Sequence, residues 1–449
     1  MASTYLKRDL SVSETIYKWT WSAWVKRSSV NGSAQNLFKS RTDGNNWVQC
    51  YFSDGGNVDR LHLHSYKNGG DHYKYTTTQQ FRDVNGWYHF VLNVDSSQST
   101  AGDRVRMYVN GERITSFSTS TNNLTNGDSL IFNCSDSGTG HTIGSWNAGS
   151  YFDGSMSHVH YSSGYSYAPT VFGSTDSTTG EWKINTSPTF TLGGNGYTVL
   201  KDGNTITDQS SNSNDFTVGA GTLTKTEDCP SNVFCTNNVL GGNSASITIG
   251  WGNSSAYRAS AGFRSVTGNI GASAGKYYAE CKINGTGTNG IMVGFVNLDT
   301  SNIQNATQHI GEDSASSGIY NNAGQIYYGN ASNFASVGAY SAGDIIQLAM
   351  DIDNGFLYFG KNGTWLNSSV PTSGGTGTGG LALSNLGSNG TYSFATSVRE
   401  GGDARWNFGN GYFEVTAVSS AGTNASGIGI FEYDVPSGYT ALSTKGLNL

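Results

Sequence analysis

The stretch Asp344–Trp365 reads DIIQLAMDIDNGFLYFGKNGTW, and it decides the fold class. Its first half alternates an apolar row with a mixed row: Ile346, Leu348, Met350 and Ile352 against Gln347, Ala349, Asp351 and Asp353. A period of two puts one row against a core and the other on the opposite face of a strand. Asn354-Gly355 then supplies two residues that tolerate positive φ, as a type I′ turn requires. The stretch therefore predicts a β-hairpin that returns through Phe356–Gly360, with a second turn at Asn362-Gly363.

The first half of the chain holds a similar pattern. Residues 86–95 read GWYHFVLNVD, and residues 105–112 read VRMYVNGE with Asn110-Gly111 at the tip. Asp-Gly and Asn-Gly pairs separate most of the other short apolar runs in residues 17–165. Strands at this spacing are typical of a sandwich or jelly roll. We therefore expect two antiparallel β units, each built around such a hairpin.

The composition agrees with a turn-rich β protein. The 449 residues suggest two or three domains of roughly 150 residues each. Charged residues make up 13%, about half of the ~25% that is usual, whereas Gly (61) and the aromatic residues Tyr (25), Phe (20) and Trp (10) are abundant. No long segment has a 3.6-residue period, so helix should be scarce. The predicted fold class is all-β: two antiparallel β-sandwich (jelly-roll) domains joined by a turn-rich connector.

Charge and cysteine content exclude several classes of protein. The net charge of −7 argues against nucleic-acid binding, which needs a basic footprint. No apolar run is long enough for membrane insertion, and Met1–Arg8 lacks the apolar stretch of a signal peptide. Five cysteines without an export signal favour reduced thiols. Pairing of Cys229 with Cys235 is the alternative.

Residues 1–165 form the first expected domain. The ordered runs GWYHFVLNVD (86–95), VRMYVNGE (105–112), IGSW (143–146) and FDGSMSHVHY (152–161) resemble the laminin-G/concanavalin-A-like lectin superfamily. The resemblance covers about a third of the chain. It implies a lectin-like β-sandwich, and it says little about the ligand.

Residues 166–240 form the expected connector. The runs YAPTVFGSTDSTTGEW (167–182), NGYTVL (195–200), DQSSNSNDFTV (208–218) and DCPSNVF (228–234) resemble segments of tailed-phage virion proteins, particularly from marine phages, that follow a lectin-like domain. Asx and Ser/Thr turns can satisfy the backbone of such a segment locally.

Residues 241–412 form the second expected β-sandwich. The order of GKYYAECKI (275–283), GIMVGF (290–295), SGIY (317–320), the central hairpin, TYSFATSV (391–398) and ARWNFG (404–409) resembles a SPRY domain, which is used for binding rather than chemistry. Residues 413–449 form a C-terminal coda. Its end, FEYDVPSGYTALSTKGL, resembles the ends of marine phage surface proteins.

Catalytic and metal-binding patterns are mostly missing from the sequence. There is no E-x-D-x-x-E run, although a glycoside hydrolase needs two carboxylates about the scissile bond. G-x-S-x-G, P-loop and H-E-x-x-H motifs are also absent. The histidine pairs His62/His64 and His158/His160 fit half-buried strand positions, with a shared metal as the alternative. The laminin-G resemblance implies calcium at a sandwich rim as a further alternative, for which Asp54, Asp136 and Asp153 are available, although they do not complete a ligand set. We expect no enzyme activity, no metal and no cofactor.

Sugar binding needs an aromatic platform with fixed polar groups beside it. The aromatic residues in or beside turns are candidates: Trp47, Tyr73, Trp146, Tyr151, Trp251 and Tyr257.

The resemblances together imply a phage virion structural protein, located in the virion and made in the host cytoplasm. The expected role is a tail fibre or host-adhesion component that binds host cell-surface glycans, contacts other virion proteins and forms a homotrimer. Many weak loop contacts, multiplied by copy number, would supply avidity. The alternative is a capsid decoration protein or head fibre, since no shaft or coiled coil precedes residue 17. A polysaccharide depolymerase is a third hypothesis, and it would need paired acids in a groove.

Overall fold

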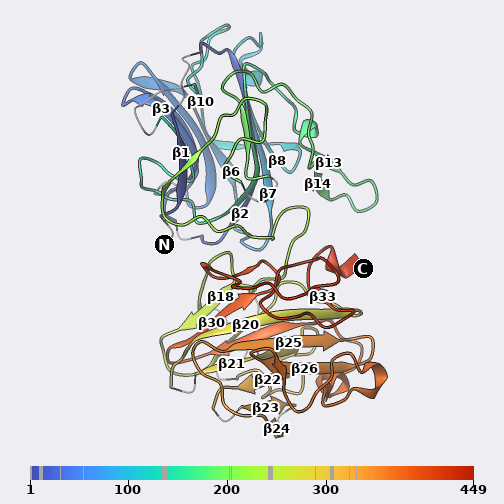
Figure 1. Cartoon of the computed structure of the whole chain (residues 1–449). Helices are drawn as coiled ribbons and strands as arrows, with labels where there is room; N and C mark the ends of the chain where they lie inside the picture. The colour runs from blue at the N-terminus through green and yellow to red at the C-terminus, as the bar shows by residue number, and fades with distance from the viewer. Residues whose placement is uncertain are drawn as a thin grey trace. The chain divides into compact units, whose positions relative to one another are not determined.

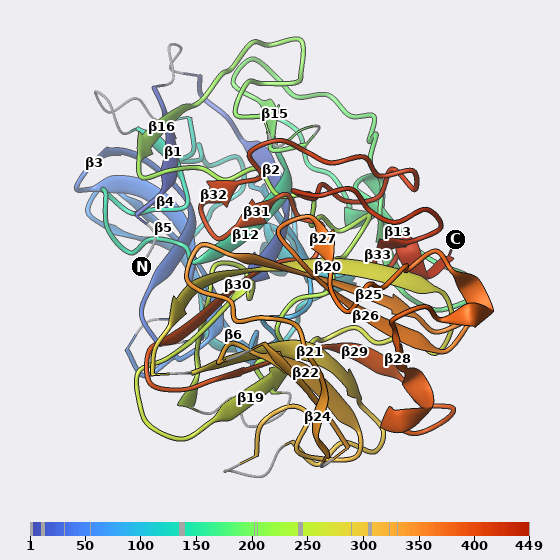
Figure 2. The ribbon, with the colours of Figure 1, turned by 60° about the horizontal axis from the view of Figure 1, so that its bottom comes forward.

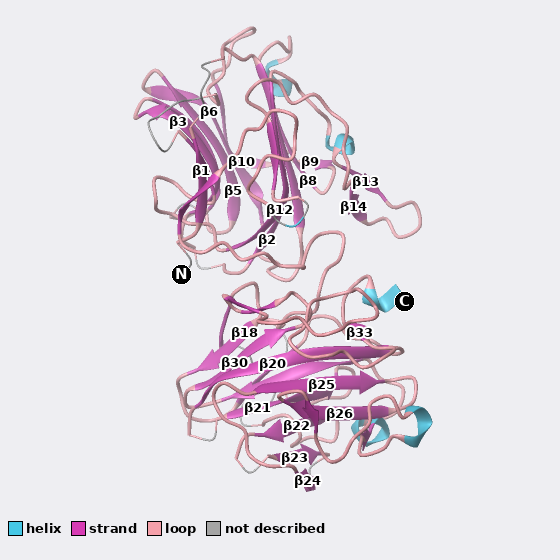
Figure 3. Cartoon of the chain, viewed as in Figure 1, coloured by secondary structure: helices cyan, strands magenta, loops and turns pink. Residues whose placement is uncertain are grey.

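The structure, a computed structural model, describes residues 3–448 except 10–13, 31, 54, 134–139, 202, 204, 241–245, 289, 304–307, 323 and 330. Strands and turns make up nearly all of the described chain (Figure 3), and helical structure is limited to short 3-10 turns. These are η1 (Ala101–Asp103), η2 (Pro169–Val171), η5 (Gly374–Thr376), η6 (Leu383–Leu386) and η7 (Gly446–Asn448). No helix in these ranges has the length and apolar character needed to cross a bilayer. The predicted all-β class is confirmed.

The chain divides once, into the compact units Met1–Lys225 and Thr226–Leu449. Each unit is built on two large sheets (Figure 1). The boundaries expected at residues 165, 240 and 412 stay predictions. The segments beyond them are integrated into the sheets: β15 and β16 from residues 166–240 pair within the first unit, and β33 from the coda pairs within the second.

The first unit is a sandwich of two antiparallel sheets. Its large sheet has eight described strands, in the order β10 (Phe117–Asn122), β6 (Gly70–Gln80), β5 (Arg60–Lys67), β4 (Asn46–Phe52), β3 (Gln35–Asp43), β11 (His141–Ile143), β1 (Tyr5–Arg8) and β16 (Thr217–Ala220). Its second sheet has the order β15 (Tyr197–Val199), β12 (Gly154–Ser163), β2 (Lys18–Arg27), β7 (Tyr88–Asp95), β8 (Val105–Val109) and β9 (Glu112–Arg113). A separate ribbon pairs β13 (Gly173–Thr175) with β14 (Trp182–Ile184).

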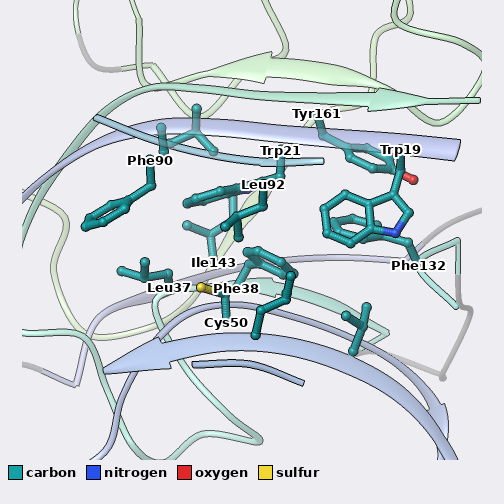
Figure 4. Packing of buried hydrophobic residues seen from close by; sticks show 14 of the residues in the cluster. Trp19, Trp21, Leu37, Phe38, Cys50, Phe90, Leu92, Phe132, Ile143 and Tyr161 are labelled. Carbon is teal, nitrogen blue, oxygen red and sulfur yellow. The ribbon is translucent and has the colours of Figure 1, made fainter. Parts of the chain in front are cut away.

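Inward-facing side chains of these two sheets form the core of the first unit. Trp19 and Trp21 of β2 are fully buried, and they contact Phe38 of β3 at ring-centroid distances of 6.3 and 4.9 Å. Figure 4 shows these rings with Phe132 and Tyr161 in the space between the sheets. Burial of such aromatic side chains is worth several kcal/mol each, since truncating a buried Phe or Trp to Ala costs about 3–5 kcal/mol. The core fixes which face of the eight-stranded sheet points outward.

The second unit is also a two-sheet structure. The larger sheet runs β17 (Thr248–Gly250), β18 (Ser255–Arg258), β30 (Gly402–Asn407), β20 (Lys276–Thr286), β25 (Ile345–Asp351), β26 (Phe356–Lys361) and β27 (Thr364–Trp365), with β28 (Leu381–Ala382) on β26 and β33 (Thr440–Ala441) on β20. The smaller sheet runs β19 (Arg264–Thr267), β29 (Tyr392–Val398), β21 (Ile291–Asn297), β22 (Ser316–Tyr320), β23 (Gln325–Tyr328) and β24 (Ala331–Ser336). β31 (Tyr412–Phe413) pairs with β32 (Thr416–Ala417). The pairing of β33 with β20 is parallel.

The central hairpin forms as predicted, but its turn differs. Asp351 of β25 pairs with Phe356 of β26, so four residues, 352–355, make the loop. Of Asn354 and Gly355, only Gly355 has a positive φ (79°), so the predicted type I′ turn is wrong. The Asp351 carboxylate instead accepts hydrogen bonds from the Asn354 backbone N–H (3.0 Å) and side-chain amide (2.8 Å). These local bonds hold a wider turn, as Asp side chains often do.

The outward row of β25 is covered by the coda rather than exposed. Figure 2 shows the red C-terminal segment along the sheet that carries β20, β25 and β26. Phe431, Val435 and Tyr439 pack there with Tyr278 and Ala349 in a buried cluster. Gln347 and Asp351, which the sequence pattern placed on a mixed face, are buried as well. The coda therefore forms a third layer of the second unit.

Candidate functional site

The candidate site is the outward face of the eight-stranded sheet in the first unit. Here a polar row crosses four strands in register: Lys39 of β3 pairs with Gln49 of β4, Gln49 with His64 of β5, and His64 with Lys74 of β6. These residues face outward because they alternate with core residues such as Phe38, Cys50, Leu63 and Tyr73. The row places an amide, an imidazole and two ammonium groups side by side.

Two stacked aromatic pairs flank this polar row. On one side Trp47 of β4 stacks on Tyr66 of β5, with ring centroids 5.4 Å apart and planes at 16°. On the other side Tyr51 stacks on His62 at 4.5 Å and 10°. Trp47 and Tyr66 are half-buried, whereas Tyr51 and His62 are buried. Direct cross-strand partners lie close enough for such ring contacts. Trp47 and Tyr66 thus present an aromatic surface beside Gln49 and His64.

The loop 144–151 brings a third aromatic residue to the same face. The indole of Trp146 meets Trp47 edge-to-face at 5.3 Å. The Lys39 ammonium lies 5.6 Å from the Trp146 ring centroid and donates to Asn147 Oδ1 at 2.6 Å. Ser150 holds the loop against the sheet, because its carbonyl accepts the Asn36 N–H at 2.9 Å. Residues 47, 66 and 146 are called the aromatic patch below.

The polar groups beside the aromatic patch have defined partners. His64 Nε2 lies 2.7 Å from Asp71 Oδ1, which orients the imidazole next to Trp47 (ring centroids 4.7 Å). Trp47 and Tyr66 offer ring faces and edges for the apolar face of a sugar, and Gln49, His64 and Lys74 offer hydrogen-bonding groups for hydroxyls. Glycoside hydrolysis needs two carboxylates at the reacting bond. The described outward positions of this sheet supply Asp71, bound to His64, and Asp43 at the β3–β4 turn, bound to Asn45 and Asn46. The arrangement fits binding.

The structure separates the six predicted site residues into three groups. Trp47 and Trp146 are in contact, and Tyr151 lies in the same loop as Trp146, where its hydroxyl donates to the Ala148 carbonyl at 2.6 Å. Trp251 and Tyr257 are exposed (45% and 39%) in the β17–β18 hairpin of the second unit.

The prediction that Tyr73 binds sugar is corrected by the structure. Its side chain is fully buried in the core of the first unit, so it cannot serve as a ligand platform. The signal against it was in the sequence: Tyr73 and Tyr75 alternate with Lys74 and Thr76, and both tyrosines face inward. Residues two positions apart on a strand share a face, so Gln49 lies on the same face as Trp47, and Tyr66 on the same face as His64. The sequence analysis did not propose Gln49 or Tyr66.

The alternative metal and disulfide readings gain no support. His62, His158 and His160 have hydroxyl partners, Thr76, Ser157 and Thr198, at 3.0, 2.7 and 3.0 Å. Within the described ranges, no group of three or more His, Cys, Asp or Glu side chains could hold a metal ion. Asp54 and Asp136 of the calcium alternative, like Cys134, lie outside the described residues. Cys229 and Cys235 are free thiols, so the disulfide alternative is wrong.

Comparison with known proteins matches each unit to a different family model. Residues 3–172 match the concanavalin A-like lectin/glucanases superfamily, and residues 276–382 match the SPRY domain. No curated protein matches the sequence. The lectin-like match contains the whole aromatic patch.

Solved structures that match parts of this chain include three of different kinds. A SPRY domain of human HERC1 shares 16% identity, with 34% of this chain and 87% of that chain covered and a TM-score of 0.27. A Bacteroides ovatus protein that is described as carbohydrate-binding shares 18% identity over 50% of this chain and 58% of that chain, with a TM-score of 0.32. A heptameric SAP-like pentraxin from Limulus polyphemus shares 15% identity over 36% and 70%, with a TM-score of 0.25.

Proposed function

We propose that the protein binds glycans without cleaving them, through the aromatic patch and the polar row of the first unit. The observation that carries the proposal is the contact of Trp47 with both Tyr66 and Trp146, directly beside Gln49 and His64. Aromatic rings beside fixed amide, imidazole and ammonium groups are the elements a sugar site needs. The lectin-like family match over residues 3–172 supports the same reading.

Binding to a panel of polysaccharides in affinity gels tests this proposal. The variant Trp47→Ala should lose at least about fivefold in affinity, since a stacked aromatic contact is worth roughly 1 kcal/mol or more. Tyr165→Ala is the control, because it removes an exposed aromatic side chain that is not a candidate ligand residue. Thermal unfolding of both variants shows whether they fold. Retained binding in folded Trp47→Ala would place the site elsewhere.

We propose further that this binding serves a phage particle, as a tail fibre or host-adhesion component. The support is the sequence resemblance of residues 167–234 and of the C-terminal end to phage surface proteins. The capsid decoration protein or head fibre is the alternative, and self-association as a trimer belongs to both. Immunogold labelling of intact particles with antibodies against the protein separates them: label on tails supports adhesion, label on heads supports decoration, and particles without label contradict both.

A further inference from the structure

The face that carries the aromatic patch is positively charged in an acidic protein. Its outward strand positions hold five cationic side chains, Lys7, Lys39, Arg41, Arg60 and Lys74, and two acidic ones, Asp43 and Asp71. Lys39 is fully buried under the loop 144–151, where it donates to Asn147. The excess is three positive charges on one face, although the whole chain has a net charge of −7. A local charge of this sign on an acidic chain attracts anions to that face.

Three of these cations lie on one line across the sheet. The register continues from Lys39 through Thr142 of β11 to Lys7 of β1, and in the other direction through Gln49 and His64 to Lys74. Neighbouring strands are about 4.8 Å apart, so Lys39 and Lys74 are separated by roughly 14 Å and Lys39 and Lys7 by roughly 10 Å. Because Lys39 is buried, a chain laid across the strands would meet an accessible cation at each end of this line, at Lys7 and at Lys74.

The cations at the two ends of this line are available to a ligand. Lys7 and Lys74 are half-buried, and their ammonium groups have no hydrogen-bond or ion-pair partner among the described residues. The carboxylate closest to this line in the register is that of Asp71, and it is hydrogen-bonded to His64 Nε2 at 2.7 Å. An uncompensated ammonium beside a sugar-sized aromatic surface favours a ligand that brings its own negative charge.

We propose that the ligand of this face is a linear acidic polysaccharide, whose carboxylate or sulfate groups pair with Lys74 while its rings contact the aromatic patch. This inference rests on the proposed glycan binding and adds the charge of the glycan. It also assigns Lys74, rather than an aromatic residue, as the position that distinguishes an acidic chain from a neutral one.

Two matched pairs of polymers test the inference on the full chain. Polygalacturonate is compared with its methyl ester, and dextran sulfate with dextran, so that the carboxylate and sulfate sources are separated. The charged member of at least one pair should bind more tightly. Its affinity should fall between 50 and 500 mM NaCl, because salt screens exposed charges. Lys74→Gln should weaken it by about two- to fivefold, as for an exposed ion pair.

Two control variants make the outcome specific to this face. Lys445→Gln removes an exposed cation from the second unit and should leave binding unchanged. Trp47→Ala should reduce binding of the charged polymer, and binding that survives it would reflect unspecific ion exchange and overturn the inference. Equal binding of charged and neutral partners overturns the acidic ligand but leaves glycan binding standing. No binding to any of the four polymers contradicts both proposals.

Discussion

The carboxylate of Glu280 on β20 accepts a hydrogen bond from the backbone N–H of Tyr433 at 2.8 Å, across 153 positions of sequence. Its other oxygen accepts the N–H of Glu432 at 2.8 Å. The Tyr278 hydroxyl (2.9 Å) and the Asn407 amide (3.3 Å) also donate to this carboxylate. Glu280 is fully buried. A single acidic side chain thus fastens the coda to the second unit.

Replacing this carboxylate should loosen the coda. Glu280→Gln keeps the shape of the side chain but turns an N–H₂ group toward backbone donors, so at least one buried donor loses its acceptor. The expected cost is about 2–4 kcal/mol of unfolding free energy in the second unit. Calorimetry should show one transition shifted downward, with faster proteolysis near residue 432. The exposed Glu181→Gln change is the control, and an unshifted transition in Glu280→Gln would contradict the prediction.

His89 makes the first unit sensitive to acid. Its ring lies between the indoles of Trp24 and Trp182, at 4.8 and 5.9 Å. Its Nδ1 accepts the Trp182 N–H at 2.9 Å, so the neutral ring carries its proton on Nε2, toward Ser22 Oγ at 2.9 Å. Burial lowers the pKa of His89 to about 3. Because this folded pKa lies below the ordinary 6.5, stability is complete above about pH 6.5 and falls as the pH decreases toward 3.

The variant His89→Gln tests this pH dependence. Its amide oxygen can still accept the Trp182 N–H, but it cannot take up a proton. Between pH 7 and 4, unfolding of the variant should bind about one proton fewer, which makes its stability fall less steeply. Urea unfolding at several pH values measures the slope. An equal slope in His89→Gln would show that His89 does not titrate in this way.

Gly111 and Trp182 should be energetically coupled. Gly111 has φ 84° in the turn between β8 and β9, and a Cβ there would lie 2.5 Å from the Trp182 ring. Gly111→Ala should therefore cost about 1–2 kcal/mol for the left-handed backbone, plus the displacement of Trp182. In a Trp182→Ala background only the backbone cost remains. A double-mutant cycle should give a coupling of about 1 kcal/mol or more.

A second glycine isolates the backbone contribution. Gly127 has φ 75° and open space around its Cβ position, so Gly127→Ala reports the left-handed cost alone. Its effect should match that of Gly111→Ala measured without Trp182. If the two Gly111→Ala costs are equal with and without the indole, the ring does not constrain this turn.

Thiol reactivity separates the cysteines by burial. Cys50, Cys235 and Cys281 are buried, and Cys229 is half-buried. Burial raises the pKa of the Cys50 and Cys281 thiols well above the ordinary range, which keeps them protonated and unreactive. In a Cys134→Ser variant, the folded protein should show one rapidly labelled thiol, Cys229, and the denatured protein four. Fewer than four after denaturation without reductant would reveal a disulfide.

The positions of the chain reversals at Asn-Gly pairs could be predicted from the sequence, because they depend on local conformational preferences. Asn110-Gly111 and Asn362-Gly363 each have two positive φ values, as two-residue type I′ turns require. At Asn354-Gly355 the same dipeptide is part of a four-residue loop, because the Asp351 carboxylate binds Asn354. A turn dipeptide predicts a reversal of the chain, and its neighbours decide the turn type.

The candidate site was predicted residue by residue but not as a group. Trp47 and Trp146 were proposed for their places beside turns, yet they are 99 positions apart and meet only through the register of β3, β4 and β11. Tyr66 comes into contact through the pairing of β4 with β5. Which strands pair depends on residues far apart in the chain, and a single sequence does not reveal that pairing. The covering role of the coda was missed for the same reason, since its Gly- and Ser-rich residues show no period.

The parallel pairing of Thr440 with Tyr277 has a consequence for biosynthesis. A ribosome adds roughly 5–20 residues per second, so about 10 to 30 seconds pass between the emergence of β20 and that of its last partner. During that interval the outward side of β20 and β25, with Tyr278, Glu280 and Gln347, has no cover. Nascent chains of this protein therefore carry an uncovered apolar and polar surface on β20 and β25 until residues 431–441 have been made.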